Sequence, residues 1–206
     1  MKLYYAPGTC SLSPQIVLLE LGLPFVAVRV DHKAHRTADG KDYYAINPKG
    51  YVPAIELDDG RRLTEGPAIV QYLADLEPDG ALAPPNGTFE RAKLQEWLNF
   101  VSTELHKNYG ALFNPALSAE TKAVFRDKLM QRYEYVAREL EGREYLLGAQ
   151  FSVADAYLFT VTRWAQANDI AIARWPALAQ FMARVGARPA VAEALRFEEE
   201  AKKKAA

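Results

Sequence analysis

Residues 3–14 have the sequence LYYAPGTCSLSP, which predicts a short aromatic strand that passes directly into a helix. The pair Pro7-Gly8 ends the strand, because neither residue suits a strand interior. Ser11 and Ser13 are both candidate N-caps, and Pro14 suits the first turn of a helix. Cys10 therefore lies at a strand-to-helix junction, and this junction forms the first β-α step of the fold.

The rest of the first third continues the alternation of strand and helix. Runs rich in β-branched and aromatic residues predict strands, and apolar residues at three-to-four spacing predict helices. The predicted segments are strands over 3–5, 25–30, 54–57 and 61–63 and helices over 14–21 and 67–76. Their order is β-α-β, a connecting segment, then β-β-α.

The remainder of the chain carries almost wholly helical patterns. Helices are predicted over 89–109, 120–140, 153–168 and 177–185. A segment rich in Pro and Gly precedes them and is typical of a linker. We therefore predict an α/β domain over 1–78, a linker over 79–87 and an all-helical domain over 88–206.

The composition excludes several classes of function. The 206 residues include 25 Lys or Arg and 26 Asp or Glu, so no overall field attracts nucleic acid or an anionic membrane. The single cysteine, Cys10, allows no internal disulfide and favours a cytoplasmic protein. The longest uncharged run, residues 5–19, is too short to span a bilayer. We expect a soluble cytoplasmic protein whose partners include neither nucleic acid nor membrane.

The junction itself offers reactive chemistry at Cys10. Backbone N–H groups at a helix start are unpaired and carry partial positive charge, which favours a thiolate. Cys10-Ser11-Leu12-Ser13 has the spacing of a thioredoxin-like redox motif whose second cysteine is replaced by Ser13. A dithiol cycle is therefore excluded, but a mixed disulfide with a small thiol is not. The alternative is a buried cysteine that acts only as a small hydrophobic side chain.

Two later segments fit a peptide-like ligand. The Val52-Pro53 bend, with a cis or a trans peptide bond, leaves the backbone of Val52 free to pair with an extended peptide. An ordinary proline at the start of a strand explains the pair equally well. Gly66 exposes N–H groups at a helix N-terminus, which suits a carboxylate, and Glu65 can pair with an ammonium. Taken alone, Glu65-Gly66 is better explained as a simple helix cap.

Together these residues resemble the glutathione site of glutathione transferases. The resemblance rests on Tyr5, Cys10-Ser11, Asn47-Pro48-Lys49-Gly50, Val52-Pro53 and Glu65-Gly66. Trp97-Leu98-Asn99 and Thr103-Glu104-Leu105-His106-Lys107 are similar to the bacterial beta class in particular, and residues 152–157 resemble the folding motif of the helical domain. The resemblance implies the glutathione transferase fold, with an α/β thioredoxin-like amino-terminal domain and an all-α carboxyl-terminal domain.

The resemblance also implies how the tripeptide is held. The γ-glutamyl head would lie on Glu65 and Gly66, and Gly66 would offer only backbone donors where many relatives carry a serine. Val52 would pair with the cysteinyl backbone beside a cis Pro53.

Other residues are implied for the glycyl end of the tripeptide. Lys49 and Tyr51 are its expected neighbours. His35 is a weaker candidate, standing where some beta-class relatives have a lysine. With His32 it lies in a polar loop, where a solvated side chain is the alternative.

The second half contributes a polar stripe around His106. Asn99, Thr103 and His106 are seven and three residues apart, so they would share one face of a regular helix. Without the resemblance a solvated helix face is the better explanation. The resemblance implies that His106 donates toward the glutathione sulfur from a cleft between the domains, with Lys107 assisting. It also implies that Thr103 and Glu104 reach the glutathione of a partner subunit in a homodimer.

The implied activity is the formation of the glutathione thiolate and its transfer to a hydrophobic electrophile. Cys10 and His106 are the principal candidates, with Tyr5 and Ser11 as minor ones, and no metal or cofactor beyond glutathione is expected. Detoxification is the implied role, with peroxidase or dehalogenation as side activities. Two alternatives are a glutaredoxin-like thiol transferase that uses a Cys10 mixed disulfide, and a non-catalytic glutathione-binding module. The electrophile would lie among helical residues such as Tyr109, Phe113 and Trp164, for which core packing is the alternative explanation.

Overall fold

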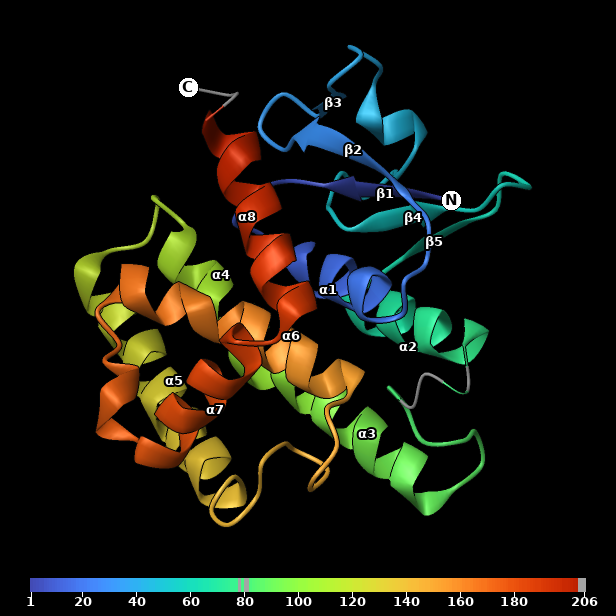
Figure 1. Cartoon of the computed structure of the whole chain (residues 1–206). Coiled ribbons are helices and arrows are strands. Elements are labelled where there is room, and N and C mark those ends of the chain that lie inside the picture. Colours follow the sequence, from blue (N-terminus) through green and yellow to red (C-terminus); the bar gives the residue numbers. More distant parts are fainter. Residues whose placement is uncertain (78, 80–81, 204–206) are drawn as a thin grey trace. The chain divides into compact units, whose positions relative to one another are not determined.

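The computed structural model describes residues 1–77, 79 and 82–203 (Figure 1). Its contacts divide the chain into two compact units, one made of Met1–Ala81 with Arg188–Ala206 and the other of Leu82–Ala187. Part of the predicted linker, residues 80 and 81, lies outside the described residues, as does residue 78 at the predicted domain boundary.

A mixed five-stranded sheet forms the centre of the first unit, in the order β3-β2-β1-β4-β5. The strands are β1 (Lys2–Tyr5), β2 (Val26–Asp31), β3 (Arg36–Thr37), β4 (Ala54–Glu56) and β5 (Arg62–Thr64). β1 pairs in parallel with β2, and the other neighbouring strands are antiparallel. This sheet confirms the predicted α/β class. The predicted connecting segment also contains β3 and a short 3-10 helix, Tyr43–Ala45.

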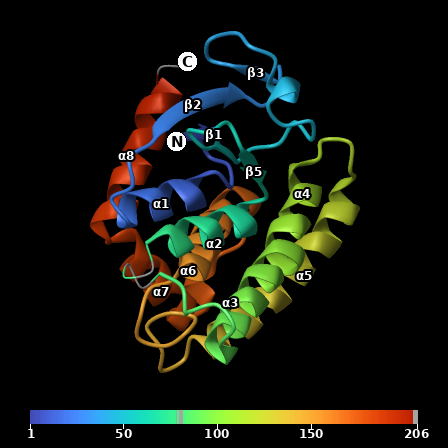
Figure 2. The same ribbon diagram turned by 90° about the vertical axis from the view of Figure 1, so that its right-hand side faces the viewer.

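Three helices belong to the same unit: α1 (Leu12–Glu20), α2 (Gly66–Leu76) and α8 (Pro189–Lys203). α1 and α2 lie side by side against one face of the sheet, and α8 packs across α1 (Figures 1 and 2). Every residue of α1 from Leu12 to Leu18 is buried, including the polar Ser13 and Gln15, because this helix is covered on several sides.

The sequence patterns did not predict α8, which lies within the segment assigned to the helical domain. Its contacts place it with the first unit instead. Val191, Ala194 and Ala201 are buried along one side of the helix. At its start, Arg188 forms two hydrogen bonds to the Glu20 carboxylate, at 2.6 and 2.8 Å. Charged residues lie between the buried residues Val191, Ala194 and Ala201. The sequence pattern therefore did not indicate a helix in this segment.

The second unit is all helical, which confirms the predicted class of this part of the chain. Its elements are α3 (Phe89–Phe100), η3 (Val101–His106), α4 (Lys107–Phe113), α5 (Ala119–Glu139), α6 (Val153–Thr162), η4 (Arg163–Asn168), η5 (Ile172–Arg174) and α7 (Pro176–Gly186). α5 runs along the path formed by α3, η3 and α4 (Figure 2). Every residue of α6 is buried, so this helix is the centre of the unit.

Two predicted helices of this unit are interrupted. The helix predicted over 89–109 contains η3, a π-helix, and the helix predicted over 153–168 ends at Thr162 and continues as the 3-10 helix η4. A π-helix has wider turns than an α-helix and shifts the direction of the side chains that follow it.

A buried carboxylate fixes the start of α6. The N–H and the hydroxyl of Ser152 both donate to Asp155 Oδ2, at 2.8 and 2.7 Å, and the N–H of Leu146 donates to Oδ1 at 2.8 Å. These bonds form the acidic half of the predicted capping box. Burial raises the pKa of Asp155 to about 6, although its hydrogen bonds act in the opposite direction.

Candidate functional site

Cys10 lies in the turn directly before α1, and its thiol donates to the Val52 carbonyl at 3.3 Å. The side chain keeps some accessible surface, yet the loss of water around its sulfur is the strongest influence on its ionisation. Burial raises the pKa of Cys10 to about 12, and the charge of Glu65 acts in the same direction. The prediction that the helix start makes Cys10 a thiolate is therefore wrong, because desolvation of the anion outweighs the local backbone hydrogen bond.

The backbone of Val52 lies beside this thiol. Its N–H makes no hydrogen bond to another residue of the described chain, and the Val52-Pro53 peptide bond is cis. The preceding carbonyl, that of Tyr51, accepts from the Tyr43 hydroxyl at 3.0 Å and from Asn47 Nδ2 at 2.6 Å. These two bonds hold the segment in place and leave the Val52 N–H available to an extended ligand.

The helix start at Glu65 has an unusual backbone. Glu65 is the N-cap of α2 and has φ of 70°. Residues other than glycine rarely adopt a positive φ, and those that do are often found at active and ligand-binding sites. Its carboxylate is exposed and pairs with Lys49 Nζ, which also donates to Thr64 Oγ1 at 2.8 Å. Lys49 and Glu65, expected at opposite ends of the tripeptide, are thus direct neighbours in this structure.

Gly66 joins this helix start to the Val52-Pro53 bend. A Cβ atom added to Gly66 would lie 4.0 Å from Pro53 Cγ, an ordinary van der Waals distance. The first turn of α2, the bend and Cys10 are therefore neighbouring parts of one surface region. Tyr51 contributes a ring that is 73% exposed next to this region.

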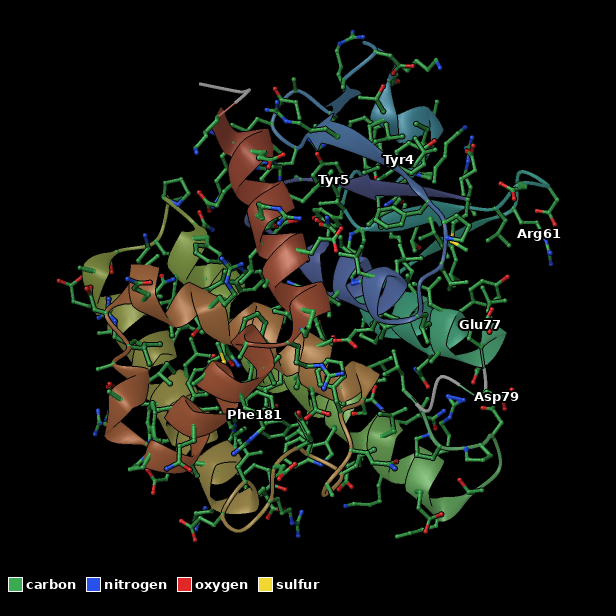
Figure 3. The ribbon with its side chains drawn as sticks, viewed as in Figure 1. Tyr4, Tyr5, Arg61, Glu77, Asp79 and Phe181 are labelled. Atoms are coloured by element: carbon green, nitrogen blue, oxygen red, sulfur yellow. The ribbon has the colours of Figure 1, made fainter. Side chains whose placement is uncertain are left out.

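Tyr5 and Ser11, the minor catalytic candidates, both have buried side chains. Tyr5 is buried on β1 beside α8 (Figure 3). Its ring packs on that of Phe197 of α8 at a centroid distance of 5.3 Å. Burial also raises the pKa of the Tyr5 hydroxyl. The Ser11 hydroxyl is buried within its own turn, where it donates to the Ala6 carbonyl at 3.1 Å and accepts from the Ala6 N–H at 3.2 Å. Both side chains stabilise the junction.

His35 is packed rather than freely solvated, contrary to the expectation for its loop. Its ring lies on the Tyr44 ring with centroids 4.5 Å apart, and its φ is 52°. Its Nδ1 atom is buried and has no hydrogen-bond partner among the described residues. The ring borders Gly50, so His35 supports the loop that carries Lys49 and Tyr51.

In the second unit, His106 is the last residue of the π-helix η3. Its Nδ1 lies 2.6 Å from the Tyr157 hydroxyl, and the centroids of the His106 and Trp164 rings are 5.0 Å apart. Asn99 and Thr103 are exposed, whereas His106 is half-buried. The predicted shared face assumed a regular α-helix, whereas Val101–His106 is a π-helix, whose wider turns change the direction of the side chains. The His106 side chain contacts Tyr157 of α6 and Trp164 of η4.

The neighbours of His106 along the chain have separate contacts. The Glu104 carboxylate accepts from Arg132 Nε at 2.6 Å, and Lys128 Nζ lies 4.0 Å away. The Thr103 hydroxyl donates to the Asn99 carbonyl at 3.0 Å. Lys107 is exposed. Glu104 is therefore engaged within its own unit.

Trp164 gathers the aromatic residues proposed for the electrophile. Its ring meets those of Tyr109 and Phe113 edge to face, at centroid distances of 5.6 and 5.5 Å. Tyr109 is fully buried and its hydroxyl bonds to that of Tyr133 at 2.9 Å, whereas Phe113 is 52% exposed. His106, Trp164 and Phe113 thus form an aromatic group with accessible surface, while Tyr109 supports it from the core.

Tyr157 is the residue of this group that sequence analysis did not single out. It lies within the folding motif and is buried in an otherwise apolar helix. The available signal was the polar atom itself, because a buried hydroxyl requires a hydrogen-bond partner.

Within residues 1–77, 79 and 82–203, neither a metal-binding cluster nor a membrane-spanning helix is present. No three His, Cys, Asp or Glu side chains gather there as a metal ion would require. No helix in that part of the chain combines the length and apolarity needed to cross a membrane.

Comparison with known proteins gives consistent matches over the chain. Residues 9–76 match the model of the glutathione S-transferase N-terminal domain, and residues 100–189 match that of the glutathione S-transferase C-terminal domain. Glutathione S-transferase GstA of Escherichia coli O157:H7 is 47% identical over 198 residues, which cover 96% of this chain and 98% of that protein.

Solved structures agree with these matches. The ternary complex of BphK, a bacterial glutathione S-transferase, is 57% identical with a TM-score of 0.95, covering 97% of this chain and 100% of that one. A bacterial beta-class enzyme from Sphingomonas chungbukensis is 42% identical with a TM-score of 0.93, covering 96% of this chain and 98% of its own.

Proposed function

The chain belongs to the glutathione S-transferase family, with bacterial beta-class relatives, and is a glutathione transferase; we propose that Cys10 and His106 act on the sulfur of its bound glutathione. The observation that carries this proposal is the bond from the Cys10 thiol to the Val52 carbonyl, beside an N–H with no described partner. A thiol donor and a peptide-pairing edge are thus found at one place.

The first unit supplies the groups that a γ-linked tripeptide requires. The Val52 N–H can pair with the cysteinyl residue as an added strand would. Glu65 carries a charge complementary to the γ-glutamyl ammonium, and the N-terminus of α2 at Gly66 suits the carboxylate beside it. Lys49 and Tyr51 on the adjoining loop would bind the glycyl end, for which Lys49 would leave its ion pair with Glu65. His35 supports this loop through its contact with Gly50.

The raised pKa of Cys10 gives this residue a specific part in the chemistry. With a pKa of about 12 the side chain is a neutral thiol near pH 7, so it can donate a hydrogen bond. When glutathione binds, the S–H can turn from the Val52 carbonyl to the glutathione sulfur. Hydrogen bonds to an anion stabilise it and lower its pKa, so this donor favours the glutathione thiolate. The same turn frees the Val52 carbonyl for the ligand backbone.

This protonation state favours conjugation over the glutaredoxin-like alternative. A mixed disulfide forms by attack of a thiolate, and burial suppresses the thiolate of Cys10. In the proposed reaction the nucleophile is glutathione itself, which attacks an electrophilic carbon.

The second unit supplies the other groups. His106 is a second donor to the sulfur, and Lys107 adds positive charge. The apolar electrophile is bound by Trp164 and Phe113, whose rings adjoin His106. Peroxidase and dehalogenation activities would use the same thiolate on other acceptors.

The remaining proposals concern assembly and setting. We infer a homodimer in which Thr103 of one subunit approaches the glutathione of the other, whereas the ion pair of Glu104 with Arg132 makes Glu104 the weaker candidate. Exposed apolar side chains on α5, Val124 and Tyr135, are available for this contact. We place the enzyme in the cytoplasm, in detoxification, with glutathione as its only co-substrate and no cofactor.

A substrate screen on matched variants tests the proposed function. Wild type, Cys10→Ala, His106→Ala and Tyr5→Phe are assayed with a chloronitrobenzene, a disulfide and a hydroperoxide. We expect conjugation by wild type and losses of at least about tenfold for the first two variants, but not for Tyr5→Phe. Disulfide reduction that disappears in Cys10→Ala while conjugation survives would establish the thiol transferase instead. Heat on calorimetric titration with glutathione, without turnover of any of the three substrates, would favour the non-catalytic glutathione-binding module.

A further inference from the structure

The hydroxyl of Tyr157 lies against one nitrogen of the His106 ring, and we propose that Tyr157 is a positioning residue that holds His106 as the Nε2–H tautomer. The distance from the hydroxyl oxygen to Nδ1 is 2.6 Å. The two residues come from different elements of the same unit, η3 and α6. The functional part of this inference rests on the proposed role of His106.

The direction of the hydrogen bond follows from the chemistry of the two groups. A phenol hydroxyl is a good donor, and the unprotonated nitrogen of a neutral imidazole is a strong acceptor. The reverse arrangement would pair a weakly acidic ring N–H with a poorly basic phenol oxygen. The short distance fits the stronger pairing. With Nδ1 as the acceptor, the proton of the neutral ring is on Nε2.

The surroundings keep the ring in this orientation. Tyr157 is 1% exposed on a helix whose residues are all buried, so its hydroxyl has little freedom to move. The Trp164 ring also contacts the His106 ring, at an interplanar angle of 65°, and this contact restricts rotation of the imidazole. The π-helix directs His106 toward this pair, and π-helical turns are common at functional sites.

A fixed tautomer has a direct consequence for the proposed chemistry. An imidazole stabilises a thiolate by donating a hydrogen bond, and only a protonated nitrogen can donate. If Tyr157 holds the proton on Nε2, the ring is a hydrogen-bond donor before glutathione binds. No free energy is then needed to convert it to the donor tautomer. Removal of the hydroxyl would divide the neutral ring between two tautomers and allow it to rotate.

Nitrogen-15 NMR of the full chain with labelled histidine tests the assignment without glutathione. The chain has three histidines, and His106 is identified by the signal that is lost in His106→Gln. Above about pH 7.5, where an ordinary imidazole is neutral, we expect His106 to show an Nε2–H and an unprotonated Nδ1 in wild type. In Tyr157→Phe we expect the two tautomers in exchange. Tyr133→Phe, which removes another buried hydroxyl of this unit, should retain the wild-type pattern.

The kcat and KM of the same variants distinguish a failure of the tautomer assignment from a failure of the proposed role of His106. We expect kcat of Tyr157→Phe to fall by about tenfold with KM for glutathione changed by less than about twofold, while Tyr133→Phe stays within about twofold of wild type. A proton on Nδ1 in wild type, or an unchanged tautomer in Tyr157→Phe, would overturn the inference whatever the turnover. The expected NMR patterns with unchanged turnover would uphold the tautomer assignment and contradict the role of His106. The wild-type spectrum decides the tautomer even if Tyr157→Phe does not fold.

Discussion

The backbone N–H of Gly8 donates to the Glu198 carboxylate at 2.9 Å, which joins the turn before Cys10 to a helix near the other end of the chain. Glu198 is 1% exposed, although it lies among charged residues of α8. Gly8 has φ of 79°, a conformation that glycine adopts without a steric penalty. A buried carboxyl group on α8 therefore helps to hold the turn that presents the thiol.

This contact predicts a difference between two substitutions at one position. Glu198→Ala removes the acceptor of this hydrogen bond from the Gly8 N–H and should lower the free energy of unfolding by about 2 kcal/mol. Glu198→Gln keeps an oxygen acceptor and should lose less. Urea unfolding of both variants measures the difference, and equal losses would show that the hydrogen bond does not contribute.

The burial of Cys10 predicts slow alkylation of the native protein. With a pKa of about 12 instead of about 8.5, the thiolate fraction near pH 7 is about three thousandfold smaller than in the unfolded chain. Iodoacetamide should therefore react with native Cys10 far more slowly than with the same cysteine in urea. The native rate should keep rising with pH above about 9, where the unfolded rate levels off.

This measurement is unambiguous because the chain has one cysteine. A native alkylation rate that reaches its plateau below pH 8 would mean that the helix start lowers the pKa of Cys10 by more than burial raises it. The same shift contributes to stability below the unfolded pKa, and that contribution is lost as the pH rises toward 12, because the folded state retains the proton.

The open space at Gly66 predicts that a serine at this position increases the affinity for glutathione. A side chain fits there, since the nearest atom to an added Cβ is Pro53 Cγ at 4.0 Å. Gly66→Ser should add a hydroxyl donor at the γ-glutamyl carboxylate and tighten glutathione binding by about three- to tenfold. Calorimetric titration measures the affinity.

Gly50 provides the control for that substitution. Its added Cβ would lie 2.8 Å from the Tyr44 ring and 3.0 Å from His35 Nδ1, at φ of 72°. Gly50→Ser should distort the loop and weaken binding. If Gly66→Ser weakened binding as well, the head group of glutathione would not lie at the α2 N-terminus.

The buried Asp155 predicts a characteristic dependence of stability on pH. Because burial raises its pKa from 3.8 to about 6, the folded state binds a proton that the unfolded state has released over this range. The contribution of Asp155 to the free energy of unfolding therefore falls as the pH rises from about 4 to 6, by about 3 kcal/mol at most.

Asp155→Asn isolates this effect. The amide should be less stable than the acid throughout, because its NH₂ group must face the donors of either Leu146 or Ser152. Since the amide does not titrate, the stability gap between the two proteins should narrow as the pH rises. A gap that widens would mean that the three hydrogen bonds prevail over burial.

Sequence patterns predicted the sheet and most helices because these depend on local periodicity. α8 was not predicted, because its fit depends on distant groups such as Glu20 and on the burial of Glu198. The π-helix was not predicted either, since Val101–His106 carries apolar residues that suit an α-helix equally well.

The candidate site was predictable in its residue types and less so in its electrostatics. The bend at Val52 and the helix start at Gly66 are local features, and they lie together as neighbours of Cys10. The ionisation of Cys10 depends on the packing of its surroundings, which spacing does not reveal. Tyr157 was missed for a similar reason, because its partner His106 is 51 residues away in the sequence.

The most direct test of the central claim is the pH titration of the thiolate absorbance of bound glutathione in wild type, Cys10→Ala and His106→Gln. If both residues donate to the sulfur, the pKa of glutathione bound to wild type should lie well below that of free glutathione, and each variant should move it back toward the free value. A wild-type titration that coincides with those of both variants would contradict the claim.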